Sequence, residues 1–124
     1  MSPRREYGDY LNDILHYSEQ AQAFVAGMDF DAFADNEEKT LAVVHALQIV
    51  GEAASKLPRS ITRLHPEIPW AKMTGMRNFI VHGYFLVDLE IVWRTVKEDL
   101  PALRVTISQL LADLEKGKLG RSGG

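Results

Sequence analysis

Four side chains that could act on a phosphodiester lie within eight residues of the chain: Arg77, Asn78, His82 and Tyr84. Arginine stays charged, and its planar guanidinium can hold a phosphate through two parallel hydrogen bonds. Histidine titrates closest to neutrality and can accept and return a proton. An asparagine can orient a neighbour, and a tyrosine hydroxyl can accept a transferred group. Together these side chains would suffice for phosphodiester cleavage without a metal ion.

A single regular helix would not bring Arg77 and His82 together. Residues five apart are separated by about 140° around a helix axis, so these two side chains would lie on different faces. Gly83 favours a helix end directly after His82. A second copy of the segment, brought in by a dimer, could complete the site. The ordinary alternative is that these polar groups are surface ion-pair and capping residues, because a histidine near a helix C-terminus interacts well with the helix dipole.

The elements that must position these side chains follow helical periodicity. Apolar residues recur at spacings of three and four over residues 7–25, and Gly27 is placed to end that helix. We interpret residues 28–35 as a loop in which Phe30 and Phe33 are apolar anchors. The first half of the chain therefore begins with one amphipathic helix and a loop.

A second helix is predicted over residues 37–57, with Asp35 or Asn36 as its N-cap and Pro58 as its stop. Ser60 could cap a short helical turn that reaches Leu64.

Residues 65–69 should be irregular, because each of the two prolines biases its preceding residue away from helix. A third helix should run over 70–82. Asp88 should cap a fourth, with a kink or an Asp99-capped restart at Pro101.

This pattern predicts an all-α protein, an antiparallel bundle of four to five helices. The apolar stripe continues to about residue 115. We assign residues 1–116 to a single helical domain and residues 117–124 to a flexible C-terminal tail, because the last segment is rich in glycine, lysine and serine.

Composition narrows the function without naming it. The chain has 124 residues, 46% of them hydrophobic, and no cysteine, which excludes a disulfide scaffold, a thiol nucleophile and thiolate metal sites. Its net charge of −3 argues against a general polyanion binder, so any RNA chemistry requires a local site. No apolar run is long enough to cross a bilayer and no secretion signal is evident, so we expect a cytoplasmic protein without a membrane partner.

The spacing of Arg77, His82 and Tyr84 resembles the signature of the HepT-like ribonuclease toxins, a branch of the HEPN superfamily. The resemblance extends over residues 7–115. It is carried further by Val50-Gly51-Glu52-Ala53, by the His65–Trp70 segment, by Gly75-Met76-Arg77-Asn78 and by Asp88 at the start of the last long helix.

The resemblance implies a homodimer of helical bundles, or a larger complex, with two Arg–His motifs facing across the interface. It implies RNA cleavage without a cofactor or metal, in which His82 acts as general acid and base, Arg77 stabilises the phosphorane and Asn78 positions them. It also implies a toxin of the type VII-like HepT/MntA system. Tyr84 would then accept AMP from a minimal nucleotidyltransferase antitoxin, and the added charge would repel RNA. Whether Glu52 contributes to the site stays open, since it could equally be a solvated carboxylate.

The sequence is also compatible with two other functions. The chain could be a non-catalytic HEPN module that binds a nucleotide or a nucleotidyltransferase, or a purely structural helical dimer. Lys72, Arg59 and Arg63 could enlarge a positive patch for RNA or form an ordinary charged face.

The remaining side chains give weaker signals. His16 and His45 show no metal-ligand spacing, and His65 could simply bind backbone carbonyls. Trp70 and Trp93 are interpreted as packing residues.

Overall fold

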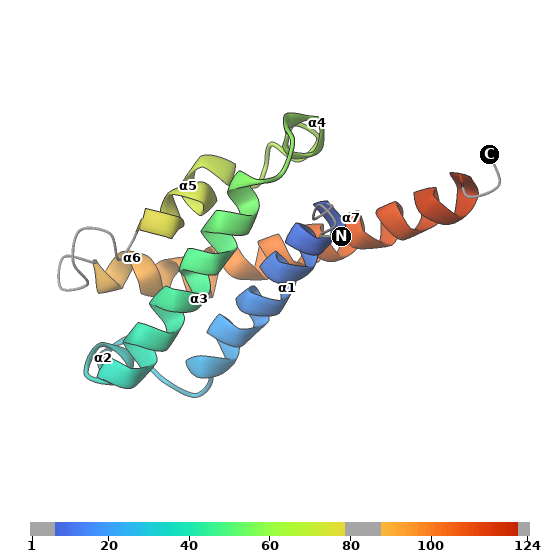
Figure 1. Cartoon of the computed structure of the whole chain (residues 1–124). Helices are drawn as coiled ribbons and strands as arrows, with labels where there is room; N and C mark the ends of the chain where they lie inside the picture. Colours follow the sequence, from blue (N-terminus) through green and yellow to red (C-terminus); the bar gives the residue numbers. More distant parts are fainter. Residues whose placement is uncertain (1–6, 79–87, 122–124) are drawn as a thin grey trace, which may run out of the picture.

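The computed structural model describes residues 7–78 and 88–121, with side chains described as far as Lys116. Every regular element in these two ranges is helical, which confirms the all-α prediction. In the described part of the chain, three long helical paths dominate, and three short α-helices and a 3₁₀ helix connect them (Figure 1).

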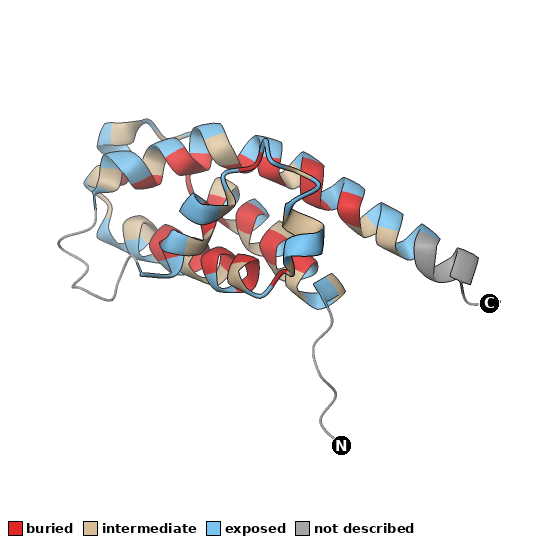
Figure 2. Cartoon of the chain, turned by 90° about the horizontal axis from the view of Figure 1, so that it is seen from above, coloured by how far each residue is buried: buried red, intermediate tan, exposed pale blue. Residues whose placement is uncertain are grey.

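Helices α1 (Tyr7–Phe24) and α3 (Glu37–Ser55) run antiparallel and pack along much of their length, and a third path lies across them (Figure 1). This third path consists of α6 (Leu89–Arg94), the π-helical stretch η3 (Thr95–Asp99) and α7 (Leu100–Arg121). The buried positions lie on the inward faces of these helices (Figure 2). Side chains with less than 2% exposure at the centre are Leu11, Ile14, Leu47, Val50, Val92, Val96, Leu103 and Ile107.

The segment after α1 contains a helix that the sequence did not lead us to expect. Gly27 adopts a positive φ of 79°, which confirms its role in ending the first helical segment. The predicted loop over 28–35 is wrong, because residues Phe30–Ala34 form the short helix α2. Asp29 caps it by accepting a hydrogen bond from the amide of Ala32 at 2.8 Å. Phe33 is fully buried, with its ring centroid 5.3 Å from that of Trp93.

Helix α3 begins as predicted, because the Asn36 side chain accepts a hydrogen bond from the amide of Lys39 at 3.0 Å. The α-helix ends at Ser55, two residues earlier than expected. A further short helix, α4 (Arg59–Thr62), starts after Pro58, so Ser60 lies within the helix and the predicted Ser60 cap is wrong. The following segment, 65–69, is irregular as expected.

Trp70 starts the short helix α5 (Trp70–Gly75), and its indole N–H donates to the carbonyl of His65 at 2.9 Å. The α-helix was expected to continue to residue 82. Instead it tightens after Gly75 into the 3₁₀ turn η1 (Met76–Asn78). At this turn the backbone of Arg77 lies close against Gly51 of α3.

The last helical path confirms Asp88 as its cap, because the Asp88 carboxylate accepts from the amides of Glu90 at 2.9 Å and Ile91 at 3.4 Å. Pro101 does interrupt the α pattern, but by the wide π turn η3 rather than by a new start capped by Asp99. Proline lacks the amide hydrogen that would reach the carbonyl of Lys97, and its ring crowds that carbonyl, so a wider turn relieves both.

Helix α7 then runs to Arg121, past the expected end near residue 115. Among the helices that the structure describes, none combines the length and apolar character needed to span a membrane.

Candidate active site

Arg77 and Asn78 lie exposed at the end of η1, directly after the buried Met76. Met73 and Met76 are both fully buried and anchor the end of α5 and the start of η1 in the core. Because Arg77 follows Met76, its backbone is held close to the core while its side chain keeps 42% of its surface accessible. Arg77 is therefore a surface residue on a turn whose backbone is packed against the core.

Gly51 of α3 lets η1 approach closely. A Cβ at this position would lie 2.5 Å from the Arg77 backbone nitrogen and 2.7 Å from the Met73 carbonyl oxygen. Only a residue without a side chain allows two backbone segments to come this near. The resemblance to the HepT-like family includes Gly51, but only the tertiary structure shows that it contacts the backbone of Arg77.

Two side chains that flank Gly51 on α3 also contact Arg77. The Gln48 side-chain amide donates a hydrogen bond to the Arg77 carbonyl oxygen at 3.2 Å. The Glu52 carboxylate lies 3.9 Å from an Nη of Arg77, and its other oxygen lies 3.8 Å from Nζ of Lys56. Gln48 was not singled out by sequence. The available signal was its spacing, since residues at i, i+3 and i+4 share one face of a helix.

His82 and Tyr84, the other two predicted site residues, lie outside the described residues. The structure thus places Arg77 and Asn78 side by side and adds Gln48, Gly51 and Glu52 from α3. In chemical terms, the described part of the site offers a guanidinium that faces solvent and one exposed carboxylate near it.

The predicted basic patch is only partly available to a ligand. Lys72 donates to a carboxylate oxygen of Asp99 at 2.6 Å and so links α5 to η3. Arg59 and Arg63 are exposed on and just after α4, and neither forms an ion pair with another described residue. Lys72 therefore has a structural partner, whereas the two arginines keep their charge open to solvent.

The other histidines have ordinary surroundings. His16 is exposed and packs edge-on against Tyr17, and His45 is exposed on α3. His65 lies 3.2 Å from the Glu67 carboxylate. The pKa of Glu67 is lowered, first by a hydrogen bond from its own backbone amide and then by the His65 side chain. Across the two described ranges, no three histidine, aspartate or glutamate side chains are grouped so that they could hold a metal ion.

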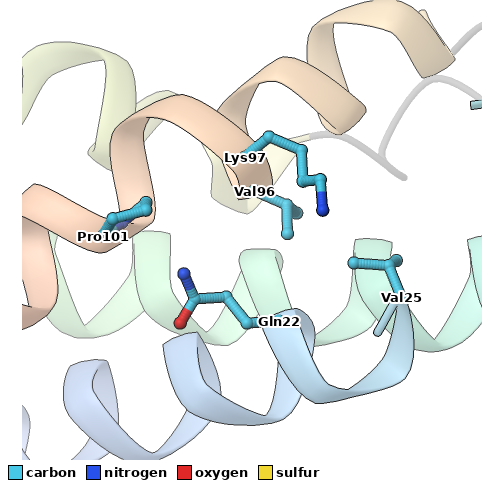
Figure 3. A pocket seen from close by; sticks show the side chains of 5 residues that line it. All are labelled: Gln22, Val25, Val96, Lys97 and Pro101. Atoms are coloured by element: carbon cyan, nitrogen blue, oxygen red, sulfur yellow. The ribbon is translucent and has the colours of Figure 1, made fainter. Parts of the chain in front are cut away.

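A hollow of about 210 Å³ lies between α1 and the junction of the π-helical stretch η3 with α7, next to Pro101 (Figure 3). Its lining residues are Gln22, Val25, Val96, Lys97 and Pro101. None of them belongs to α3, α5 or η1, the elements that carry and contact Arg77. The hollow is therefore separate from the described part of the candidate site.

Comparison with known proteins finds relatives that are named as ribonucleases. The family model described as ribonuclease HepT-like matches residues 14–110. A protein of Thermococcus cleftensis named Probable ribonuclease HepT is 41% identical over 107 residues, covering 86% of this chain and 97% of the relative. A candidate RNase of Methanocaldococcus jannaschii is 35% identical over 114 residues, covering 92% and 98%. One from Caldanaerobacter subterraneus subsp. tengcongensis is 34% identical over 102 residues, covering 82% and 91%.

No solved structure matches the chain significantly. The chain belongs to the ribonuclease HepT-like family.

Proposed function

We propose that this member of a ribonuclease family is an endoribonuclease that needs no metal ion, with Arg77 and His82 as its catalytic residues. The observation that carries the proposal is the state of Arg77: its backbone is fixed by α3, while its guanidinium is accessible and has only one distant carboxylate partner among the described residues. Exposed ion pairs contribute little energy, so the distant Glu52 carboxylate does not prevent Arg77 from binding a phosphate.

The proposed reaction is an internal transfer at phosphorus. The ribose 2′-oxygen attacks the adjacent phosphorus, the bond to the 5′-oxygen of the next nucleotide breaks, and a 2′,3′-cyclic phosphate forms. His82 takes the proton from the 2′-hydroxyl, and an imidazolium returns a proton to the leaving 5′-oxygen. Arg77 stabilises the charge that develops on the phosphorane oxygens, and Asn78 positions the pair. Cleavage in excess EDTA that yields cyclic phosphate ends tests this chemistry.

A homodimer, alone or within a larger complex, is part of the proposal. Two proton transfers at opposite oxygens call for two acid–base groups, and a dimer that joins two Arg–His motifs supplies two copies of His82.

We expect light scattering to give twice the 14.0 kDa chain mass and cleavage per chain to fall on dilution through the dimer dissociation range. A monomeric mass with cleavage per chain independent of concentration would contradict the composite site.

The biological role that we propose is that of a toxin controlled by a MntA-like nucleotidyltransferase. Tyr84 lies two residues after His82, so a group added to its hydroxyl would be close to the catalytic histidine in the chain. The tyrosine oxygen would attack the α-phosphorus of ATP and release pyrophosphate. The resulting phosphodiester adds negative charge and bulk, which disfavours an RNA phosphate nearby.

Production of the chain with its nucleotidyltransferase partner and ATP is expected to add the mass of one or more adenylyl groups, the first on Tyr84, and to suppress RNA cleavage. A Tyr84→Phe variant should stay unmodified at this position and remain active in the partner's presence, because it lacks the acceptor oxygen. Intact mass and peptide mapping give the readout, with Tyr17→Phe as the matched control. A stable complex without any mass change would favour the non-catalytic binding module instead.

A further inference from the structure

We infer that Gln48 and Glu52 of α3 are positioning residues for Arg77, acting on its backbone and on its guanidinium respectively. The assignment rests on the proposed function, because it concerns the arginine that stabilises the transition state. The observation behind it is that one exposed residue is contacted by α3 at its backbone nitrogen, its carbonyl oxygen and its side-chain end.

The backbone contacts fix where the Arg77 side chain begins. Its nitrogen packs against Gly51, and its carbonyl oxygen accepts the hydrogen bond from Gln48 at 3.2 Å. These two contacts lie on either side of the Arg77 Cα, so they limit rotation of the turn that ends η1. A helix is a rigid support, and groups held by helices are positioned more precisely than groups held by loops.

Glu52 acts at the other end of the same side chain. At 3.9 Å from an Nη of Arg77, and with 57% of its own side chain exposed, its carboxylate draws the guanidinium towards α3 without a close hydrogen bond. Lys56 shares the same carboxylate at 3.8 Å. Because Glu52 is shared between two cations and lies at one end of the guanidinium, it orients Arg77 and leaves the other N–H donors of the guanidinium for a phosphate.

The positions on α3 explain why both residues reach one arginine. Gln48 and Glu52 are four residues apart, so they lie on one face of the helix, with Gly51 beside them. The missing side chain at Gly51 lets η1 lie close enough for both contacts to form. The three α3 positions therefore act as one support for the site.

The test compares Gln48→Leu and Glu52→Gln in two backgrounds, the natural chain and an Arg77→Ala variant, in which the residual cleavage is measured and no side chain remains beyond Cβ. With Arg77 present, each change is expected to lower kcat about fivefold to tenfold, with KM unchanged or lower. In the Arg77→Ala background the same changes should lower the residual kcat less than about twofold, because no charged side chain is left for them to position. Gln109→Leu and Glu115→Gln, at exposed positions of α7, are the matched controls.

A second measurement does not depend on catalysis. The Nε–H resonance of Arg77, identified by its loss in Arg77→Ala, should shift and exchange faster with solvent in Gln48→Leu and Glu52→Gln but not in the controls. Thermal unfolding of all variants checks that the fold is retained.

Three outcomes separate the possibilities. Reduced kcat only where Arg77 is present, with the resonance changes, supports the inference. Equal losses in both backgrounds, or natural activity in both α3 variants while Arg77→Ala is inactive, overturns the inference and leaves the proposed function standing. Undiminished cleavage by Arg77→Ala overturns the proposed function and the positioning role with it.

Discussion

RNA cleavage by this protein is expected to fall by about 10²–10⁴-fold when His82 or Arg77 is changed to alanine. Loss of His82 removes the group that moves protons, and loss of Arg77 removes the charge that stabilises the phosphorane. The fold should persist in Arg77→Ala, since the guanidinium is exposed and its ion pair with Glu52 is long. The measurement is single-turnover cleavage of a labelled RNA in EDTA, with circular dichroism to verify folding.

Arg94→Ala is the matched control for this experiment. Arg94 is also an exposed arginine, on α6, and it forms no ion pair with another described residue. Its loss removes the same charge from the surface without changing Arg77 or the α3 residues that contact it, so cleavage should stay within about twofold of the natural chain. If either His82→Ala or Arg77→Ala cleaves RNA as well as Arg94→Ala does, the proposed active site is wrong.

Gly51→Ala is expected to destabilise the protein and to reduce cleavage at the same time. The new Cβ would lie 2.5 Å from the Arg77 nitrogen and 2.7 Å from the Met73 carbonyl oxygen, and these are backbone atoms that no rotamer change can move. Such overpacking costs about 1–3 kcal/mol or more. This destabilisation outweighs the stabilisation of at most about 1 kcal/mol that replacing glycine by alanine normally brings in a helix interior.

Relief of the clash in Gly51→Ala must push η1 away from α3 and so displace Arg77. A displacement of about 1 Å at a catalytic group can cost on the order of 10²-fold in rate. Denaturant unfolding and RNA cleavage measure the two effects.

Gly75→Ala provides the control, because a Cβ at Gly75 meets no atom of the described residues within 4 Å. It should leave both stability and cleavage intact. A Gly51→Ala variant as stable and active as Gly75→Ala would refute the close packing of α3 against η1.

Local sequence signals predicted the helix boundaries that local interactions control. Asn36 and Asp88 cap their helices through hydrogen bonds to amides two or three residues away, and Gly27 ends the first segment through its own φ. These interactions involve neighbours in the chain, so the sequence alone reveals them. The same reasoning missed α2 although its cap, Asp29, is equally local. A helix of five residues depends on tertiary packing, and Phe33 packs against Trp93, sixty residues further on.

The sequence by itself determined the helical class of this protein, the N-caps of α3 and α6 and the candidate residues Arg77, Asn78, His82 and Tyr84. Only the tertiary structure decided how Arg77 is presented. It replaced the expected straight helix with a 3₁₀ turn at this point, brought that turn against Gly51 and placed Gln48 and Glu52 around it. Helical periodicity describes one segment at a time, whereas the position of Arg77 depends on the closest approach of two segments almost thirty residues apart, and the volume of the side chains between them sets that distance.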